Sequence, residues 1–313
     1  MRLVVERPGM FTTIQDGGRW GFARWGVPVS GPMDRWSARL ANRLVGNPDA
    51  SAVLELTLVG PRLRVERECA VAITGAEFDV HVGTRAVRSP WSGGVSAGST
   101  IAFGARHTGA RAYVSVGGSF AVPSVLGSRS TEVRAPFAGM AGRALRAGDE
   151  IPLGESPSLA RVVDGDGFRA WWDAASRGAH RTLRVMATEP ATAAFETLCA
   201  TPFVVSTRSD RMGCRLEGTA SWGAIPGGLP SAPTTLGAVQ LPAGGSPILL
   251  MADHPTTGGY VQIAVLCRAD RQIAGQLAPG DRIQFVPVSR DEARSAHLAR
   301  ERALTALAPE VLE

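Results

Sequence analysis

Residues 12–34 read TTIQDGGRWGFARWGVPVSGPMD, a stretch in which five glycines and two prolines interrupt a series of polar side chains. Glycine reaches positive φ and lets the backbone approach its neighbours closely, whereas proline fixes φ. This composition is poor for a helix and for a continuous strand. It predicts a structured loop that displays polar side chains. The alternative is a turn-rich entry into a β domain.

Three further loops have the same character and lie beside strand-like sequence. They read LGSRSTE at 126–132, SDRMGCRLEG at 209–218 and ADHPTTGGY at 252–260. Each combines Arg or Asp with Ser, Thr and Gly. Four such loops in one chain indicate a polar site that is assembled from distant segments.

The loops carry side chains suited to binding a small anionic or amide-bearing substrate. Guanidinium groups hold carboxylates or phosphates at two points, and carboxylates either orient those groups or transfer protons. The candidate catalytic residues are Asp16, Arg19, Asp210 and Arg211. The candidate substrate-binding residues are Gln15, Ser30, Arg129, Ser130, Thr131, Arg215, Asp253, Thr256, Thr257 and Tyr260. The alternative is that Arg–Asp pairs only stitch the loops together.

Length and composition point to a folded protein of two domains. The chain has 313 residues, of which 44% are hydrophobic, and domains usually run to about 100–200 residues. No apolar run approaches the roughly 20 residues of a membrane span, and the N-terminus MRLVVERPG lacks the apolar core of a signal peptide. We therefore expect a cytoplasmic protein with no membrane contact.

The basic residues exclude several classes of chemistry. All 33 of the lysine-plus-arginine residues are arginine, so the chain has no Schiff-base lysine, no P-loop lysine and no lysine that could carry biotin. The net charge of +5 is spread along the chain, without the basic and aromatic stripe of a nucleic-acid binder. The four cysteines form no CxxC pair, so no metal site is expected. Cys214, in a polar loop, is either a reactive thiol or a buried, inert one.

Strand patterns outnumber helix patterns, which predicts a mostly β fold with a few helices. We expect an N-terminal module at 1–154, a linker at 155–180, a C-terminal module at 181–290 and a helical tail at 291–313. Within these, a helix is predicted at 34–45, with Asp34 as its N-cap, and a short one at about 192–199.

A short pattern recurs three times. It reads VSAGSTIAF at 95–103, LRAGDEIPL at 145–153 and LAPGDRIQF at 277–285. Each copy places an apolar residue before a glycine turn and an alternating strand, which favours related β modules in both halves of the chain. Chance similarity is the alternative.

Two further residues have open interpretations. Glu55 falls within an apolar strand and is either a site-facing carboxylate or one half of a buried ion pair. His254 is the only histidine inside one of the four loops, and is either a base or a packing residue.

The motifs resemble one family over nearly the whole chain, about residues 3–288. The matching pieces are TTIQDGGRWG, GVPVSGPMDR, LANRLVGNP, LGSRSTE, SDRMG-x-RLEG, GAVQLP and TTGGY. They are similar to the C subunit of 5-oxoprolinase (allophanate hydrolase subunit 2), to the carboxyltransferase domain of biotin-dependent urea carboxylase, and to the antagonist of a sporulation kinase inhibitor. The resemblance implies two cyclophilin-like β-barrel modules and an obligate partner, the B subunit of the same family.

The resemblance also implies a function. The first hypothesis is the C subunit of an ATP-dependent 5-oxoprolinase, an amide hydrolase that converts 5-oxoproline to glutamate together with the A and B subunits and is inactive without them. No carrier or carboxylase domain is fused in this sequence, which favours that hypothesis. ATP would then act at the level of the complex, at a site that the sequence does not locate. The alternatives are a carboxyltransferase subunit whose biotin rides on a partner chain, with urea or another small amide as acceptor, and a non-enzymatic regulator that binds a partner protein.

Overall fold

The computed structural model describes residues 2–155, 182–188, 192–223, 225 and 229–306. The chain divides into two compact units that are not consecutive in sequence. The N-terminal unit comprises residues 1–20, 30–176 and 304–313, and the C-terminal unit comprises residues 21–29 and 177–303. The predicted linker at 155–180 lies, apart from Glu155, outside the described residues.

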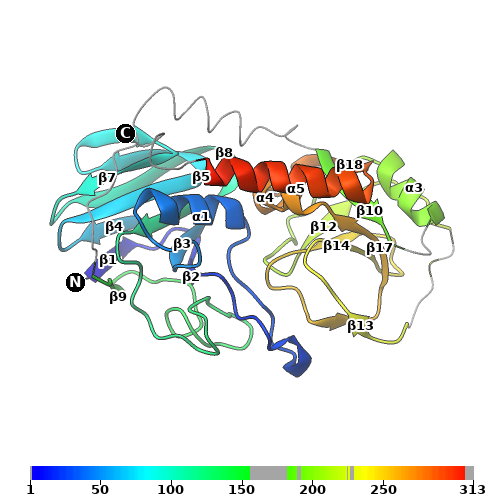
Figure 1. The fold of residues 1–313 in the computed structure, drawn as a ribbon, viewed down its shortest axis with the longest axis horizontal. Coiled ribbons are helices and arrows are strands. Elements are labelled where there is room, and N and C mark those ends of the chain that lie inside the picture. Colours follow the sequence, from blue (N-terminus) through cyan, green and yellow to red (C-terminus); the bar gives the residue numbers. More distant parts are fainter. Residues whose placement is uncertain (1, 156–181, 189–191, 224, 226–228, 307–313) are drawn as a thin grey trace. The chain divides into compact units, whose positions relative to one another are not determined.

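The N-terminal unit is built on a nine-stranded sheet (Figure 1). Its main path runs, in spatial order, through β2 (Phe11–Gln15), β3 (Val53–Thr57), β8 (Thr100–Val116), β4 (Arg62–Val65), β1 (Arg2–Arg7) and β9 (Glu150–Pro152). The long strand β8 also pairs with β5 (Cys69–Val82), which in turn pairs with β6 (Arg85–Arg88) and β7 (Trp91–Val95). Alternate residues of these strands form the apolar core.

Helix α1 (Arg35–Leu44) packs on this sheet through one apolar face. It begins after Asp34, whose carboxylate accepts hydrogen bonds from the Ser37 N–H at 2.9 Å and the Ser37 hydroxyl at 2.6 Å. The predicted N-cap is confirmed, because the side chain satisfies a backbone donor that the first helical turn leaves unpaired.

The C-terminal unit contains a closed seven-stranded barrel. The ring runs through β10 (Thr182–Ala187), β17 (Val261–Leu266), β14 (Ala238–Leu241), β15 (Ile248–Leu250), β12 (Gly213–Glu217), β11 (Phe203–Val205) and β18 (Arg282–Pro287). Closure leaves the ring without an exposed edge. A two-stranded ribbon, β13 (Ala232–Pro233) with β16 (Thr257–Gly258), stands apart from the ring. The mostly β class predicted from sequence is confirmed.

The described helices of the C-terminal unit include the short one predicted near residue 192. They are α3 (Thr192–Ala200), α4 (Arg271–Gly275) and α5 (Arg290–Thr305), with the 3-10 turns η1 (Ala23–Trp25) and η2 (Arg268–Asp270). The predicted helical tail corresponds to α5. Its residue Leu304, which belongs to the N-terminal unit, is fully buried in the cluster formed around α1. No helix among the described residues is long and apolar enough to span a membrane.

The pattern repeated in the sequence makes the same turn three times. Gly98, Gly148 and Gly280 all adopt positive φ, at 79°, 87° and 90°. In each turn the glycine N–H donates to the carbonyl oxygen of a valine, which is Val65, Val5 or Val205 respectively. The N–H of the same valine donates in return to the carbonyl oxygen of the residue that follows the glycine. The three copies therefore share a backbone hydrogen-bond pattern as well as a sequence pattern.

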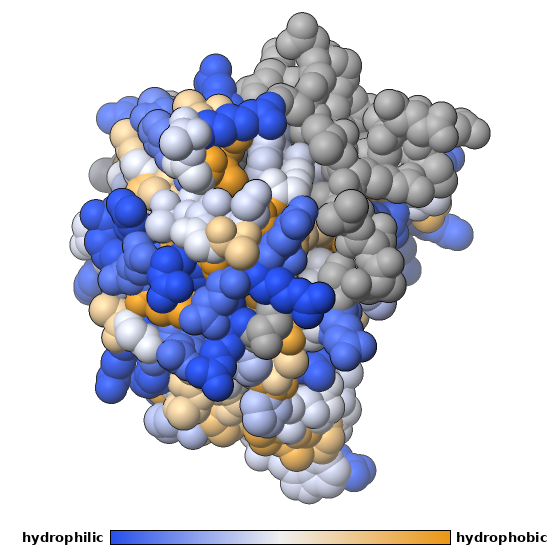
Figure 2. All heavy atoms as spheres, turned by 90° about the vertical axis from the view of Figure 1, so that its left-hand side faces the viewer, coloured by the Kyte–Doolittle hydropathy of each residue, from blue (hydrophilic) through white to orange (hydrophobic). Residues whose placement is uncertain are grey.

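The face of the molecule shown in Figure 2 is largely hydrophilic, with apolar residues visible in small areas between the polar ones. Exposed ion pairs link neighbouring strands of the N-terminal sheet, including Arg2–Glu150, Arg62–Glu6 and Arg88–Glu77. Such pairs contribute little to stability because solvent screens them.

Two glycines of the N-terminal unit allow the cost of backbone strain to be measured apart from the cost of a steric collision. Both Gly75 and Gly98 have positive φ, 85° and 79°. A Cβ at Gly75 would lie 2.5 Å from the Arg111 carbonyl oxygen, whereas a Cβ at Gly98 would meet nothing within 4 Å. We expect Gly98→Ala to cost about 1–2 kcal/mol of unfolding free energy through strain alone. Gly75→Ala should cost about 1–3 kcal/mol more through overpacking. Urea denaturation of both variants measures the difference, and equal costs would contradict the collision.

Candidate functional site

Asp16, predicted as a catalytic residue, joins two loops of the N-terminal unit. One carboxylate oxygen accepts from the Gly18 N–H at 3.0 Å, from the Ser130 hydroxyl at 2.8 Å and from the Ser128 hydroxyl. The other accepts from the Arg129 N–H at 2.5 Å, and the Asp16 N–H donates to Ser130 Oγ at 2.9 Å. The side chain is 8% exposed. Four donors thus occupy the carboxylate, which anchors the loop at 128–131 to the end of β2.

Arg19 lies inside the same polar cluster. The side chain is 1% exposed, donates to the Ser130 carbonyl and stacks over the Phe137 ring with its guanidinium carbon 4.7 Å from the ring centroid. Arg129 is half-buried and donates from Nε to the Val122 carbonyl at 2.8 Å. Both arginines contact backbone carbonyls, so each helps to fix the loop that follows Ala121.

Gln15 continues the cluster along β2. Its Nε2 donates to Thr13 Oγ1 at 3.0 Å and to the Thr131 carbonyl at 3.5 Å. Thr131 in turn donates from Oγ1 to the Ile14 carbonyl at 3.0 Å. Gln15 Oε1 is buried and accepts no hydrogen bond within the described part of the chain. The structure thus brings together the predicted residues Gln15, Asp16, Arg19, Arg129, Ser130 and Thr131.

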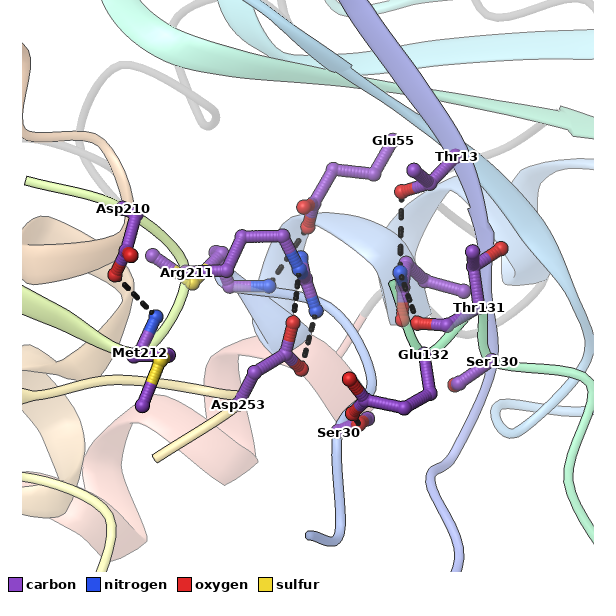
Figure 3. Close-up of polar contacts among 12 residues, drawn as sticks. Thr13, Ser30, Glu55, Ser130, Thr131, Glu132, Asp210, Arg211, Met212 and Asp253 are labelled. Atoms are coloured by element: carbon purple, nitrogen blue, oxygen red, sulfur yellow. Dashed lines mark hydrogen bonds and ion pairs between the residues drawn. The ribbon is translucent and has the colours of Figure 1, made fainter. Parts of the chain in front are cut away.

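Ser30 lies beside Glu132, a residue absent from the predicted site (Figure 3). Ser30 has a φ of 57°, in the left-handed region. Its hydroxyl lies 3.4 Å from one carboxylate oxygen of Glu132, and the other oxygen accepts from the Arg134 N–H at 2.9 Å. Glu132 is 3% exposed. The sequence feature that could have pointed to Glu132 as a site residue is its position at the end of the LGSRSTE loop.

Glu55 has buried hydrogen-bond partners. Its carboxylate accepts from the Met33 N–H at 2.7 Å and from the Tyr113 hydroxyl at 2.9 Å. The Tyr113 oxygen also accepts from the Asp34 N–H at 2.8 Å. Burial, together with the nearby Glu55 carboxylate, raises the pKa of Tyr113 well above its usual value. This group ties the start of α1 to the sheet.

In the C-terminal unit, Arg211 and Asp253 form a two-point ion pair (Figure 3). Nε and Nη2 of Arg211 lie 2.7 and 3.0 Å from the two carboxylate oxygens. The side chains are 8% and 9% exposed, and the Asp253 N–H donates to the Arg211 carbonyl at 2.9 Å. This pair links the loops at 209–218 and 252–260, as the stitching alternative expects.

The remaining predicted residues of this unit lie closer to solvent. Asp210 is exposed, and one of its oxygens accepts from the Met212 and Gly213 N–H groups at 2.8 and 3.2 Å, which shapes the local turn. Arg215 and Thr257 are exposed, Thr256 is half-buried, and Tyr260 is 51% exposed. Cys214 lies in β12 and is 3% exposed, which agrees with the buried alternative.

His254 has a defined orientation that the sequence does not predict. Its Nδ1 lies 2.8 Å from the Pro255 carbonyl oxygen and 3.0 Å from Thr234 Oγ1. A carbonyl oxygen can only accept, so Nδ1 carries the proton and Nε2 holds the free lone pair. Burial lowers the pKa of His254, which favours the neutral ring.

Gln240 lies on β14 in the same unit and is 3% exposed. Its Nε2 is buried and finds no acceptor among the residues that the structure describes. The α-carbon of Gly258 comes so close that a Cβ there would lie 2.9 Å from this nitrogen and 3.4 Å from Thr234 Cγ2. Gln240 was absent from the predicted site, although it falls in the GAVQLP motif.

Groups of three or more potential metal ligands are absent from the described residues.

Comparison with known proteins identifies the family. Residues 25–287 match the family described as "Carboxyltransferase domain, subdomain A and B". The chain belongs to this carboxyltransferase-domain family.

Relatives in the family differ greatly in length. The chain is 34% identical over 310 residues to the C subunit of 5-oxoprolinase from Escherichia coli (strain K12), covering 98% of this chain and 97% of that protein. It is 32% identical over 329 residues to urea amidolyase of Lachancea kluyveri, covering 97% of this chain but 18% of that protein. The crystal structure of Kluyveromyces lactis urea carboxylase is similar over 100% of this chain and 30% of its own, with a TM-score of 0.86 at 30% identity.

Asp16 and Asp210 allow a matched test of loop anchoring. In Asp16→Asn an amide NH2 group takes the place of one carboxylate oxygen and faces hydrogen-bond donors that it cannot accept from. We therefore expect the free energy of unfolding to fall by about 1–3 kcal/mol. Asp210→Asn changes an exposed turn and should cost less than about 0.5 kcal/mol. Thermal and urea unfolding of the two variants test this expectation. A similar small effect at both positions would show that the Asp16 carboxylate does not anchor the loop.

Breaking the buried Arg211–Asp253 pair should be costly because it leaves an unpaired buried charge. We expect Arg211→Ala to lower unfolding free energy by about 3–5 kcal/mol. The double variant with Asp253→Ala should cost at least about 1 kcal/mol less than the sum of the single variants. Arg208→Ala, which removes an exposed partner of Glu217 next to the same loop, is the control and should cost less than about 1 kcal/mol. Additive single costs would argue against direct coupling.

Proposed function

We propose that this chain is the C subunit of an ATP-dependent 5-oxoprolinase complex. The observation that supports the proposal most is the length of the E. coli match, which covers 97% of a protein with this name. A second 5-oxoprolinase C subunit, from Haemophilus influenzae, is 32% identical over 90% of this chain and 89% of its own length.

The chemistry of the described residues fits a small substrate that contains an amide and an anionic group. 5-Oxoproline carries a lactam and a carboxylate. Ring opening breaks the lactam C–N bond, adds a water oxygen to the carbonyl carbon and leaves the nitrogen as the amine of glutamate. Buried guanidinium groups such as that of Arg19 bring positive charge near the polar loops.

ATP would activate the amide, and the energy of its hydrolysis would drive ring opening. The chain has no lysine, so the P-loop arrangement for binding its phosphates does not fit these residues. We therefore assign ATP to the complex as a whole and give it no step on this chain. The function requires the A and B subunits as partners.

A second candidate is carboxyl transfer to urea or another small amide, with biotin on a partner chain. The similarity to urea amidolyases over 97% of this chain supports it, as does the structural match to urea carboxylase. Biotin is attached through a lysine, which this chain does not have, so the carrier would have to be another chain.

Reconstitution with co-purified partners tests the two candidates. We expect two unbiotinylated partners in affinity purification from the native host, and ATP hydrolysis by the complex that depends on 5-oxoproline and yields glutamate. Omission of this chain should abolish the activity. Partners would be identified by mass spectrometry beside a streptavidin blot.

The same experiment can also contradict the hydrolase proposal. A biotinylated partner, together with bicarbonate-dependent ATP use stimulated by urea and not by 5-oxoproline, would replace the hydrolase proposal by carboxyl transfer.

A further inference from the structure

Residues 21–26, which we call the aromatic arm, hold two aromatic rings at the surface of the molecule. The arm reads GFARWG and contains the 3-10 turn η1. Trp25 is 59% exposed, Arg24 is exposed and Phe22 is half-buried. Large apolar groups that are gathered at the surface mark interaction sites more often than single exposed ones do.

The arm is held in shape by its own residues. The Trp25 N–H donates to the Phe22 carbonyl at 3.0 Å, and the centroids of the two rings lie 5.7 Å apart. Within the part of the chain that the structure describes, the hydrogen bonds and ring contacts of the arm all join two of its own members. A Cβ at Gly21 or at Gly26 would meet nothing within 4 Å. The packing of the described chain therefore gives no reason for two aromatic rings at this place, whereas a contact with another molecule does.

Arg24 gives the arm a charge that is ready to bind an anion. Its guanidinium carbon lies 3.9 Å from the centroid of the Trp25 ring. A guanidinium group stacked through its face keeps the N–H groups at its edge, where they can hold a carboxylate at two points. Arg24 forms no ion pair with a described residue. Residues 17–33 contain neither Asp nor Glu, so the stretch around the arm provides no carboxylate of its own.

This combination of groups favours a protein over a membrane or a nucleic acid. Trp and Arg are the residues that most often dominate the binding energy of protein interfaces. Anionic membranes attract clusters of roughly four to eight basic residues, whereas the arm carries Arg24 alone. Nucleic-acid binders have a basic stripe, whereas the net charge of +5 is spread along this chain. The E. coli relative is named as a subunit of 5-oxoprolinase, which also favours a protein partner.

We propose that the aromatic arm is the docking surface for a partner subunit with an acidic face. A carboxylate of that subunit binds the edge of Arg24, and an apolar pocket beside the carboxylate receives the Trp25 ring. The choice of a subunit of the complex as the partner rests on the proposed function, whereas the arm itself rests on the geometry. The arm includes none of the candidate catalytic or substrate-binding residues, so assembly and catalysis can be measured apart.

The dissociation constant between the full chain and its purified partner subunits tests the arm, by calorimetry or biolayer interferometry. Trp25→Ala and Arg24→Ala should each weaken assembly at least about tenfold. Melting temperatures of the isolated variants should stay close to that of the parent, because the arm is bonded only to itself in the described chain. Added salt should weaken assembly of the parent and of Trp25→Ala, whereas Arg24→Ala should be less sensitive to salt.

Two matched controls lie elsewhere in the N-terminal unit. Met10 is 55% exposed and precedes β2, whereas the arm follows that strand. Arg67 is exposed and has no ion-pair partner among the described residues. Met10→Ala and Arg67→Ala remove an apolar group and a charge of the same kinds, and assembly should stay within about twofold of the parent.

A photoreactive side chain identifies what covers the arm. Trp25 is replaced by p-benzoylphenylalanine, the complex is irradiated, and the cross-linked peptides are sequenced by mass spectrometry. A cross-link to an Asp- or Glu-containing peptide of a partner subunit supports the inference. A cross-link to a second copy of this chain, or to another segment of the same chain, would overturn it. Sedimentation with phosphatidylserine–phosphatidylcholine vesicles would also overturn it if Trp25→Ala abolished vesicle binding and left subunit affinity unchanged.

The arm and the proposed activity fail in different ways. Arm variants that assemble as tightly as the parent would overturn the inference, even where their complexes hydrolyse 5-oxoproline. A parent chain that binds no partner subunit would overturn it as well. A complex that needs Arg24 and Trp25 for assembly but does not hydrolyse 5-oxoproline supports the docking surface and contradicts the activity.

Discussion

The N-terminal unit depends on one buried carboxylate. Asp16 lies at the end of β2, and its oxygens hold donors from Gly18, Ser128, Arg129 and Ser130. The partner loop is 112–114 residues further along the chain, so the carboxylate closes a long loop of sequence at a single point. A neutral side chain of the same shape would face some of these donors with another donor. The loop at 128–130 is therefore held at the end of β2 by a charge as well as by its backbone conformation.

Local features of this fold could be predicted from sequence because their causes are local. The Asp34 cap acts on Ser37, three residues away, and each repeated glycine turn is closed by a bond between residues three apart, such as Asp149 to Arg146. The strand-rich class follows from short apolar segments between turns. These features require no knowledge of which segments meet in space.

Partner choice within the polar loops could not be predicted, because it is decided by contacts between distant segments. The sequence marks Asp16, Arg211 and Asp253 as charged residues in loops, but does not reveal that the first holds serine hydroxyls and that the other two hold each other. For the same reason Gln240 was absent from the predicted site, and the two interpretations of His254 stayed open. The surroundings of Gln240 depend on the backbone of Gly258, and the tautomer of His254 depends on the Pro255 carbonyl.

The burial of the cysteines gives this protein a set of internal reporters of local opening. Cys69 lies in the N-terminal sheet and Cys214 and Cys267 lie in the C-terminal unit, all at 3% exposure or less. Burial raises the pKa of Cys69 to about 11, so its thiol is both covered and protonated at neutral pH. Cys199, on α3, is only partly covered. A thiol reagent should therefore modify Cys199 first, whereas modification of Cys69 and Cys214 would time the opening of β5 and β12, and modification of Cys267 the opening of the turn that follows β17.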